Sequence, residues 1–153
     1  MSATTTIWTE KAFLDHCGRV LPADEISHTK ALILWAKGLG LTCVFESRKR
    51  GPVFAPDLSR GVGRSSGFEL WCPPRRGVSR AYVRINAATI GRWERFREPE
   101  LKAEFETQLR ALPNLVLGEA GVKGAPKIYL NELDFKRLED FLDWTLLRST
   151  WLV

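Results

Sequence analysis

Residues 68–86 read FELWCPPRRGVSRAYVRIN and contain two strand patterns that a short turn separates. Apolar side chains occupy every second position on both sides of the turn, and a period of two is typical of β-strands. Pro73-Pro74 ends the first strand, because proline has no amide hydrogen to donate to a neighbouring strand. The connection through Arg75-Arg76-Gly77 holds no helical pattern, so we predict that the two strands pair antiparallel.

Further patterns extend this arrangement toward both ends of the chain. Additional strands are expected at 41–46, 53–55, 115–117 and 127–130. Helices are expected at 9–16, from 24–27 to 37, at 99–112 and from 133–134 onward. Residues 87–96 fit either a helix weakened by Gly91 or an irregular connector. This order predicts an α+β fold, in which N- and C-terminal helices pack mainly on one face of an antiparallel meander of about four strands.

Capping residues, glycines and a proline set the expected helix ends. Thr9 is a candidate N-cap, and Gly18 is expected to stop the first helix. Gly38 is expected to lie just past the C-terminus of the second helix. Pro99 suits the first turn of a helix, because its missing amide hydrogen has no partner there.

Length and composition indicate one domain. The chain has 153 residues, 44% of them hydrophobic and 27% charged, as in ordinary globular proteins. No repeat or long linker divides it. We therefore expect a single domain over 1–153, with a helical extension at 1–23, a core at 24–147 and an apolar tail at 148–153.

The three cysteines favour reduced thiols. Cys17, Cys43 and Cys72 are odd in number and far apart, and no CxxC pair occurs, which argues against a zinc site or a disulfide scaffold. The chain shows neither a signal-peptide pattern nor an apolar run of membrane-spanning length. We expect a cytoplasmic protein with no membrane partner, cofactor or metal.

Positive charge is concentrated in residues 48–97. This segment has twelve basic residues against three acidic ones, a net charge of +9, whereas the rest of the chain carries −4. Such an excess attracts polyanions, and the planar guanidinium of arginine matches phosphate. We predict binding to DNA or RNA, or to a protein of a nucleic-acid-processing complex. The candidate residues are Arg48, Lys49, Arg50, Arg60, Arg64, Trp71, Arg75, Arg76, Arg80, Tyr82, Arg84, Arg92, Trp93 and Arg95.

The two faces of the predicted sheet differ in composition. The predicted core face collects Leu41, Cys43, Phe45, Phe68, Leu70, Cys72, Ala81, Val83 and Ile85. The opposite face collects Thr42, Val44, Glu46, Glu69, Trp71, Arg80, Tyr82, Arg84 and Asn86. If this face is open to solvent, its two aromatic rings can stack bases between arginines. The alternative is that a helix or the C-terminal Trp151 covers them.

The remaining basic positions each allow two interpretations. The arginines of the turns, and of the Gly/Ser/Arg loop at 59–67, either clamp a phosphate backbone or form a charged surface paired with the acidic last helix. Arg92, Trp93 and Arg95 either contact nucleic acid or a partner, or belong to a connector that places Trp93 and Phe96 in the core. A bacterial or phage inhibitor module that docks on a nucleic-acid enzyme is the main alternative function.

A nuclease is a second alternative. Pro56-Asp57, followed by Glu69 on a strand, has the outline of a PD-(D/E)xK nuclease core, in which two carboxylates hold Mg²⁺. Glu46 is expected near Glu69. However, Trp71 occupies the lysine position, and Arg84 on the neighbouring strand is a poor base. We therefore assign no catalytic or metal-binding residue.

Several core positions carry a resemblance. Leu34-Trp35-Ala36, Gly40-Leu41, the strand meander, Leu112-Pro113 and Phe141-Leu142-Asp143-Trp144 together resemble a bacterial domain of unknown function. The resemblance covers roughly residues 28–147 and implies a helix, a strand meander and two closing helices. It implies no catalytic or binding residue.

Overall fold

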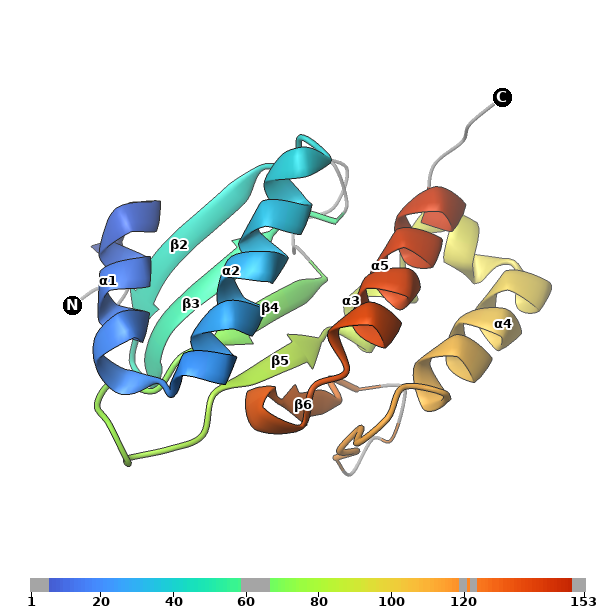
Figure 1. Cartoon of the computed structure of the whole chain (residues 1–153). Coiled ribbons are helices and arrows are strands. Elements are labelled where there is room, and N and C mark those ends of the chain that lie inside the picture. The colour runs from blue at the N-terminus through green and yellow to red at the C-terminus, as the bar shows by residue number, and fades with distance from the viewer. Residues whose placement is uncertain (1–5, 59–66, 119–120, 122–123, 150–153) are drawn as a thin grey trace.

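A computed structural model of the chain describes residues 6–58, 67–118, 121 and 124–149. Within these residues an antiparallel sheet carries helices on one side (Figure 1). The α+β fold class predicted from the sequence is therefore confirmed. Among the described helices, none combines the length and the apolar character needed to cross a bilayer.

Within the described residues the sheet has six strands in chain order, and each strand is antiparallel to the next. They are β1 (Thr6–Ile7), β2 (Cys43–Arg48), β3 (Gly51–Pro56), β4 (Phe68–Trp71), β5 (Tyr82–Ile85) and β6 (Lys127–Tyr129). The four central strands and β6 match the predicted patterns. β1 was not predicted, since two residues are too few to show a period. The expected strand at 115–117 is a single bridge between Val116 and Lys127.

Five α-helices and two 3-10 helices complete the described chain. They are α1 (Glu10–Val20), α2 (Ala23–Gly38), α3 (Ala87–Ile90), η1 (Glu94–Arg97), α4 (Pro99–Arg110), η3 (Leu130–Glu132) and α5 (Phe135–Ser149). In Figure 1, α1 and α2 lie in front of strands β2 to β4, and α5 and α4 lie to their right.

Two predicted helix ends are wrong. Thr9 caps α1 as expected, with its hydroxyl accepting from the Ala12 amide at 3.0 Å, but α1 continues through Gly18 to Val20. Val20 packs against the core and Leu21, directly after the helix, is buried, so apolar packing continues past the glycine. Gly38 is the last residue of α2, and Gly40 adopts the left-handed conformation, with φ 71°, that ends the segment.

The predicted core face is confirmed. In the register, Phe45 lies opposite Phe54, and Leu70 lies opposite Val83. All these side chains are buried in one cluster with side chains from α1, α2, α4 and α5. Of the nine predicted core-face residues only Cys43 is half-buried rather than buried. The alternation of the strands therefore has the predicted phase.

The connector between β5 and α4 is partly helical and partly irregular, so it combines the two forms expected for residues 87–96. It holds the short α3, a turn and η1. Phe96 is fully buried and Trp93 packs partly against the core. A side chain at Gly67 would lie 3.1 Å from Trp93 and from Ile90, so the close approach of this connector to the sheet requires glycine there.

Candidate nucleic-acid interface

The outer face of the sheet carries an ion-pair cluster around Arg48. Its guanidinium donates to Glu46 Oε2 and to Glu69 Oε2, both at 2.8 Å. Trp71 Nε1 donates to Glu69 Oε1 at 3.1 Å, and Arg84 lies 3.9 Å from the same oxygen. Burial acts to lower the pKa of Arg48, but the hydrogen bonds to Glu69 and Glu46 outweigh it and raise that pKa. Arg48 is therefore engaged within the protein.

A row of side chains crosses the same face. The register places Val53 opposite Trp71, Trp71 opposite Tyr82, and Tyr82 opposite Tyr129. Trp71 and Tyr82 are nearly parallel, at 12°, with ring centroids 6.2 Å apart. The Arg48 guanidinium lies 5.4 Å from the centre of the Trp71 ring.

Trp71 is only 9% exposed, whereas Tyr82 is half-buried. The buried neighbours of Trp71 in the second apolar cluster are Val53 and Ala55, which also come from strands. Among the described residues, strand side chains and Arg48 are thus the neighbours of Trp71. Solvent reaches Tyr82, so Tyr82 is the ring of this pair that a ligand can contact.

A cleft opens beside this row, and we call it the basic cleft. Its volume is about 380 Å³, and its lining includes Lys49, Arg50, Trp71, Arg80, Tyr82 and Lys127. Lys49 and Arg50 form the tip of the β2–β3 turn, Arg80 precedes β5, and Lys127 begins β6. None of the described residues that line the cleft is acidic. Four cations from three segments therefore surround one site.

The cations of the basic cleft are held in different ways. Arg80 Cζ lies 3.7 Å from the centre of the Tyr129 ring, and its guanidinium donates to Asn131 Oδ1 at 2.6 Å. Lys127 Nζ lies 4.9 Å from the centre of the Tyr82 ring. Such cation–π contacts orient a side chain without neutralising its charge.

Lys49 and Arg50 are the freest cations of the basic cleft. Both are exposed, and neither has a salt-bridge partner within the part of the chain that the structure describes. Arg80 differs, since it also lies 3.5 Å from the Glu132 carboxylate. The turn therefore offers two uncompensated charges to a polyanion.

Other predicted residues lie away from the basic cleft. Arg75 and Arg76 are exposed on the β4–β5 connection, where Arg76 donates to the Arg19 carbonyl at 2.9 Å. Arg84 lies farther along β5 than Tyr82 and faces Glu69 instead. Arg60 and Arg64 lie outside the described residues.

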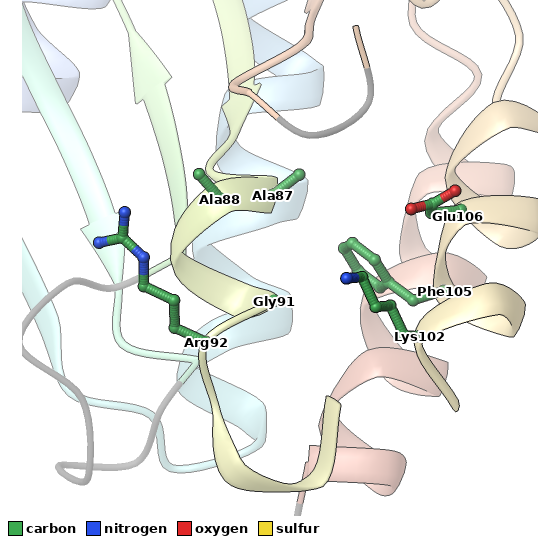
Figure 2. A pocket seen from close by; sticks show the side chains of 7 residues that line it. All are labelled: Ala87, Ala88, Gly91, Arg92, Lys102, Phe105 and Glu106. Carbon is green, nitrogen blue, oxygen red and sulfur yellow. The ribbon is translucent and has the colours of Figure 1, made fainter. Parts of the chain in front are cut away.

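The Arg92–Arg95 segment follows the opposite end of β5 from Tyr82. Arg92 borders a separate hollow of about 190 Å³ between α3 and α4, and its guanidinium points away from Lys102 and Phe105 (Figure 2). Trp93 packs against the core and Arg95 is half-buried. The structure does not bring this segment together with the basic cleft.

Lys127 is a site residue that the sequence did not predict. The strand pattern at 127–130 was visible, but nothing indicated its neighbour in the sheet. The register pairs β6 with β5, and this brings Lys127 beside Tyr82 and opposite Arg84. A search for basic residues on all short strand patterns, rather than within 48–97, would have found it.

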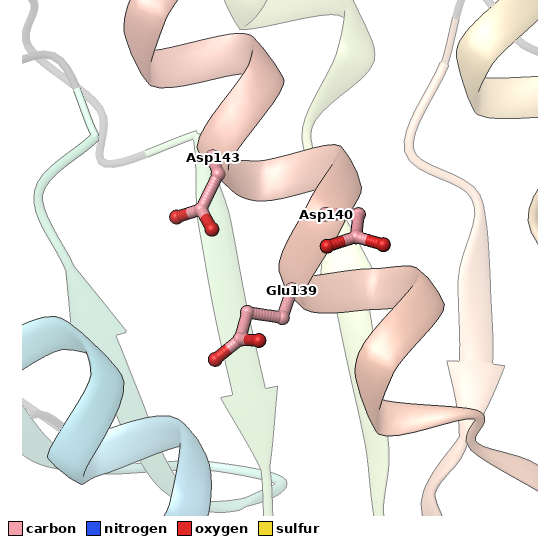
Figure 3. Close-up of side chains that lie close together, drawn as sticks. All are labelled: Glu139, Asp140 and Asp143. Carbon is pink, nitrogen blue, oxygen red and sulfur yellow. The ribbon is translucent and has the colours of Figure 1, made fainter.

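The structure gives no support to a nuclease site at Glu69. The Arg48 guanidinium occupies both Glu46 and Glu69. Among the described residues, the one group of three carboxylates close enough to share a cation is Glu139, Asp140 and Asp143, on α5 (Figure 3).

The α5 carboxylates have ordinary surface partners. Trp35 Nε1 donates to Asp143 Oδ1 at 2.8 Å, while Lys136 lies 3.6 Å from Glu139 and 3.0 Å from Asp140. These contacts account for the group without a metal. Neither Asp57 nor Glu69 belongs to it.

Comparisons of the chain with protein-family models, curated proteins and solved structures found no match. The resemblance to a bacterial domain of unknown function therefore stays a prediction.

Proposed function

We propose that this chain is a nucleic-acid-binding module and that the basic cleft is its contact surface. The observation that carries the proposal is the convergence of Lys49, Arg50, Arg80 and Lys127 around the half-buried ring of Tyr82. The negative charge of phosphates would neutralise these cations, and the flat faces of bases can stack on an aromatic ring.

The energetics favour an electrostatic mode of binding. Each phosphate that a lysine or arginine neutralises releases condensed counterions, so affinity falls steeply as salt rises. Lys49 and Arg50 break no described salt bridge when they bind a phosphate. They are expected to contribute more than Arg48, whose guanidinium would first have to leave two carboxylates.

Fluorescence anisotropy with labelled DNA and RNA at about 50 mM and 200 mM salt tests the proposal. The variant Lys49→Ala/Arg50→Ala removes two charges from the basic cleft. A matched control, Lys30→Ala/Arg110→Ala, removes two exposed charges from α2 and α4. We expect the cleft variant to bind several-fold more weakly and the control to bind like the parent. Absence of binding at low salt, or equal losses in both variants, would contradict the proposal.

An acidic protein partner is the competing occupant of the same surface. It would be recognised by a stoichiometric complex that survives nuclease treatment and is lost in Lys49→Ala/Arg50→Ala. Together with absent oligonucleotide binding, that result would replace the nucleic-acid proposal with the inhibitor or interaction module. Glu69→Ala offers a further check, because a nuclease centred on Glu69 would lose its Mg²⁺-dependent cleavage in this variant.

A further inference from the structure

We infer that the basic cleft holds one unpaired nucleotide, so that the protein prefers single-stranded to duplex nucleic acid. This inference rests on the proposed function and names its ligand. It follows from the size of the cleft, from its aromatic floor and from the position of the two free cations.

The cleft has the size of a small-molecule site. Its volume of about 380 Å³ lies near the lower end of the range of roughly 300–1,000 Å³ that is usual for such sites. A space of this size suits one nucleotide unit. A base inside a duplex is stacked on both sides and presents no free face, so an aromatic contact requires an unpaired base.

Tyr82 forms the reachable part of the floor. Trp71 is buried beside it and nearly parallel to it, so the Tyr82 ring is held in place before any ligand binds. The Lys127 ammonium lies 4.9 Å from the centre of the same ring, so a base that stacks there displaces the flexible lysine side chain, whose charge stays available to the phosphate. Val78 on the β4–β5 connection is 52% exposed at the cleft. The floor therefore combines a fixed aromatic surface, a cation and an exposed apolar side chain.

The β2–β3 turn fixes the phosphate-binding cations beside this floor. Gly51 has a φ of 130°, and a side chain there would collide with the carbonyl oxygen of Cys72. The absence of a Cβ lets the turn approach the end of β4. Lys49 and Arg50 precede this glycine directly, so they stand at the cleft, where the phosphate of a stacked nucleotide needs a counter-charge.

Competition binding distinguishes the two strand forms. An oligonucleotide of about 16 nucleotides is compared with the duplex of the same sequence, and both compete against one labelled single strand. We expect the single strand to compete about tenfold better, the scale of one stacked base. Tyr82→Leu should lose most of this preference, whereas Tyr82→Phe, which keeps the ring, should retain it.

A second measurement needs no variant. A single strand that contains abasic sites keeps every phosphate but has no base to stack. We expect it to bind the unaltered protein about tenfold more weakly than the intact strand. Equal binding of intact and abasic strands, or of single strand and duplex, would overturn the inference while leaving the proposed function in place. Binding of neither strand form at low salt would overturn both.

Discussion

The inner and outer faces of the sheet are built from alternate residues of the same strands, yet different kinds of contact keep their side chains from solvent. On β4, Phe68 and Leu70 are fully buried against the helices. Glu69 and Trp71 on the outer face are only 7% and 9% exposed. Among the described residues, Glu69 contacts Arg48, and Trp71 packs with Val53 and Ala55 in a small apolar cluster separate from the main core. Low exposure therefore marks the main core on one face, and a small apolar cluster with an ion-pair network beside a ligand-sized cleft on the other.

The largest effect is expected on the inner face. Leu70→Ala removes a fully buried side chain from the centre of the sheet and should lower the free energy of unfolding by about 2–5 kcal/mol. Val44→Ala on the outer face removes a side chain that is 37% exposed and should cost less than about 1 kcal/mol. Urea unfolding measures both. Similar losses at the two positions would contradict the assignment of the faces.

A smaller loss is expected in the Arg48 cluster. Glu69→Ala leaves the Arg48 guanidinium and the Trp71 indole without their shared acceptor, and should cost about 2 kcal/mol. The control Lys136→Ala breaks an exposed, solvent-screened pair and should leave stability almost unchanged. If Glu69→Ala is no worse than this control, ion pairing does not hold the outer face together.

An effect confined to alkaline pH is expected from the inner face. The hydrogen bond between the thiols of Cys17 and Cys72, whose sulfurs are 3.6 Å apart, raises the pKa of Cys72, and burial raises it further. An unfolded thiol titrates near a pKa of about 8.5. Stability from this group is therefore fully present below pH 8.5 and falls as pH rises above it, by up to about 1.4 kcal/mol per pH unit.

Thermal unfolding between pH 7 and pH 10 measures this dependence. Cys72→Ala should show a shallower decline than the parent protein over the alkaline part of the range. Cys43→Ala is a weaker comparison, because burial also raises the pKa of Cys43. An unchanged alkaline slope in Cys72→Ala would show that other groups cause the decline.

The alternation of apolar and polar residues, together with the positions of glycine and proline, predicted much of the fold. The phase of 68–85 placed Phe68, Leu70, Val83 and Ile85 in the core, and these residues are buried there. The strand patterns do not say which distant strands become neighbours. The position of Lys127 beside Tyr82 follows from β6 pairing with β5, a contact between segments far apart in sequence.

Charge counting found the basic segment but could not separate engaged from free cations. Arg48 and Lys49 are adjacent in sequence, yet Arg48 binds two carboxylates while Lys49 is exposed at the cleft. Arg48 is the last residue of β2, and the register of the sheet brings Glu69 of β4 within its reach. Lys49 lies in the turn that follows, so it has no such neighbour in the described part of the sheet. Pairing of this kind depends on the folded sheet rather than on local composition.

The salt dependence of single-strand binding tests the central proposal most directly. A plot of log binding constant against log salt has a slope of about −0.7 for each phosphate that is neutralised on a single strand. Lys49→Ala/Arg50→Ala should make this slope shallower by about 1.4, because two phosphate contacts are lost. Lys30→Ala/Arg110→Ala should leave it unchanged. An unchanged slope in the cleft variant, or an equal change in both, would contradict the account.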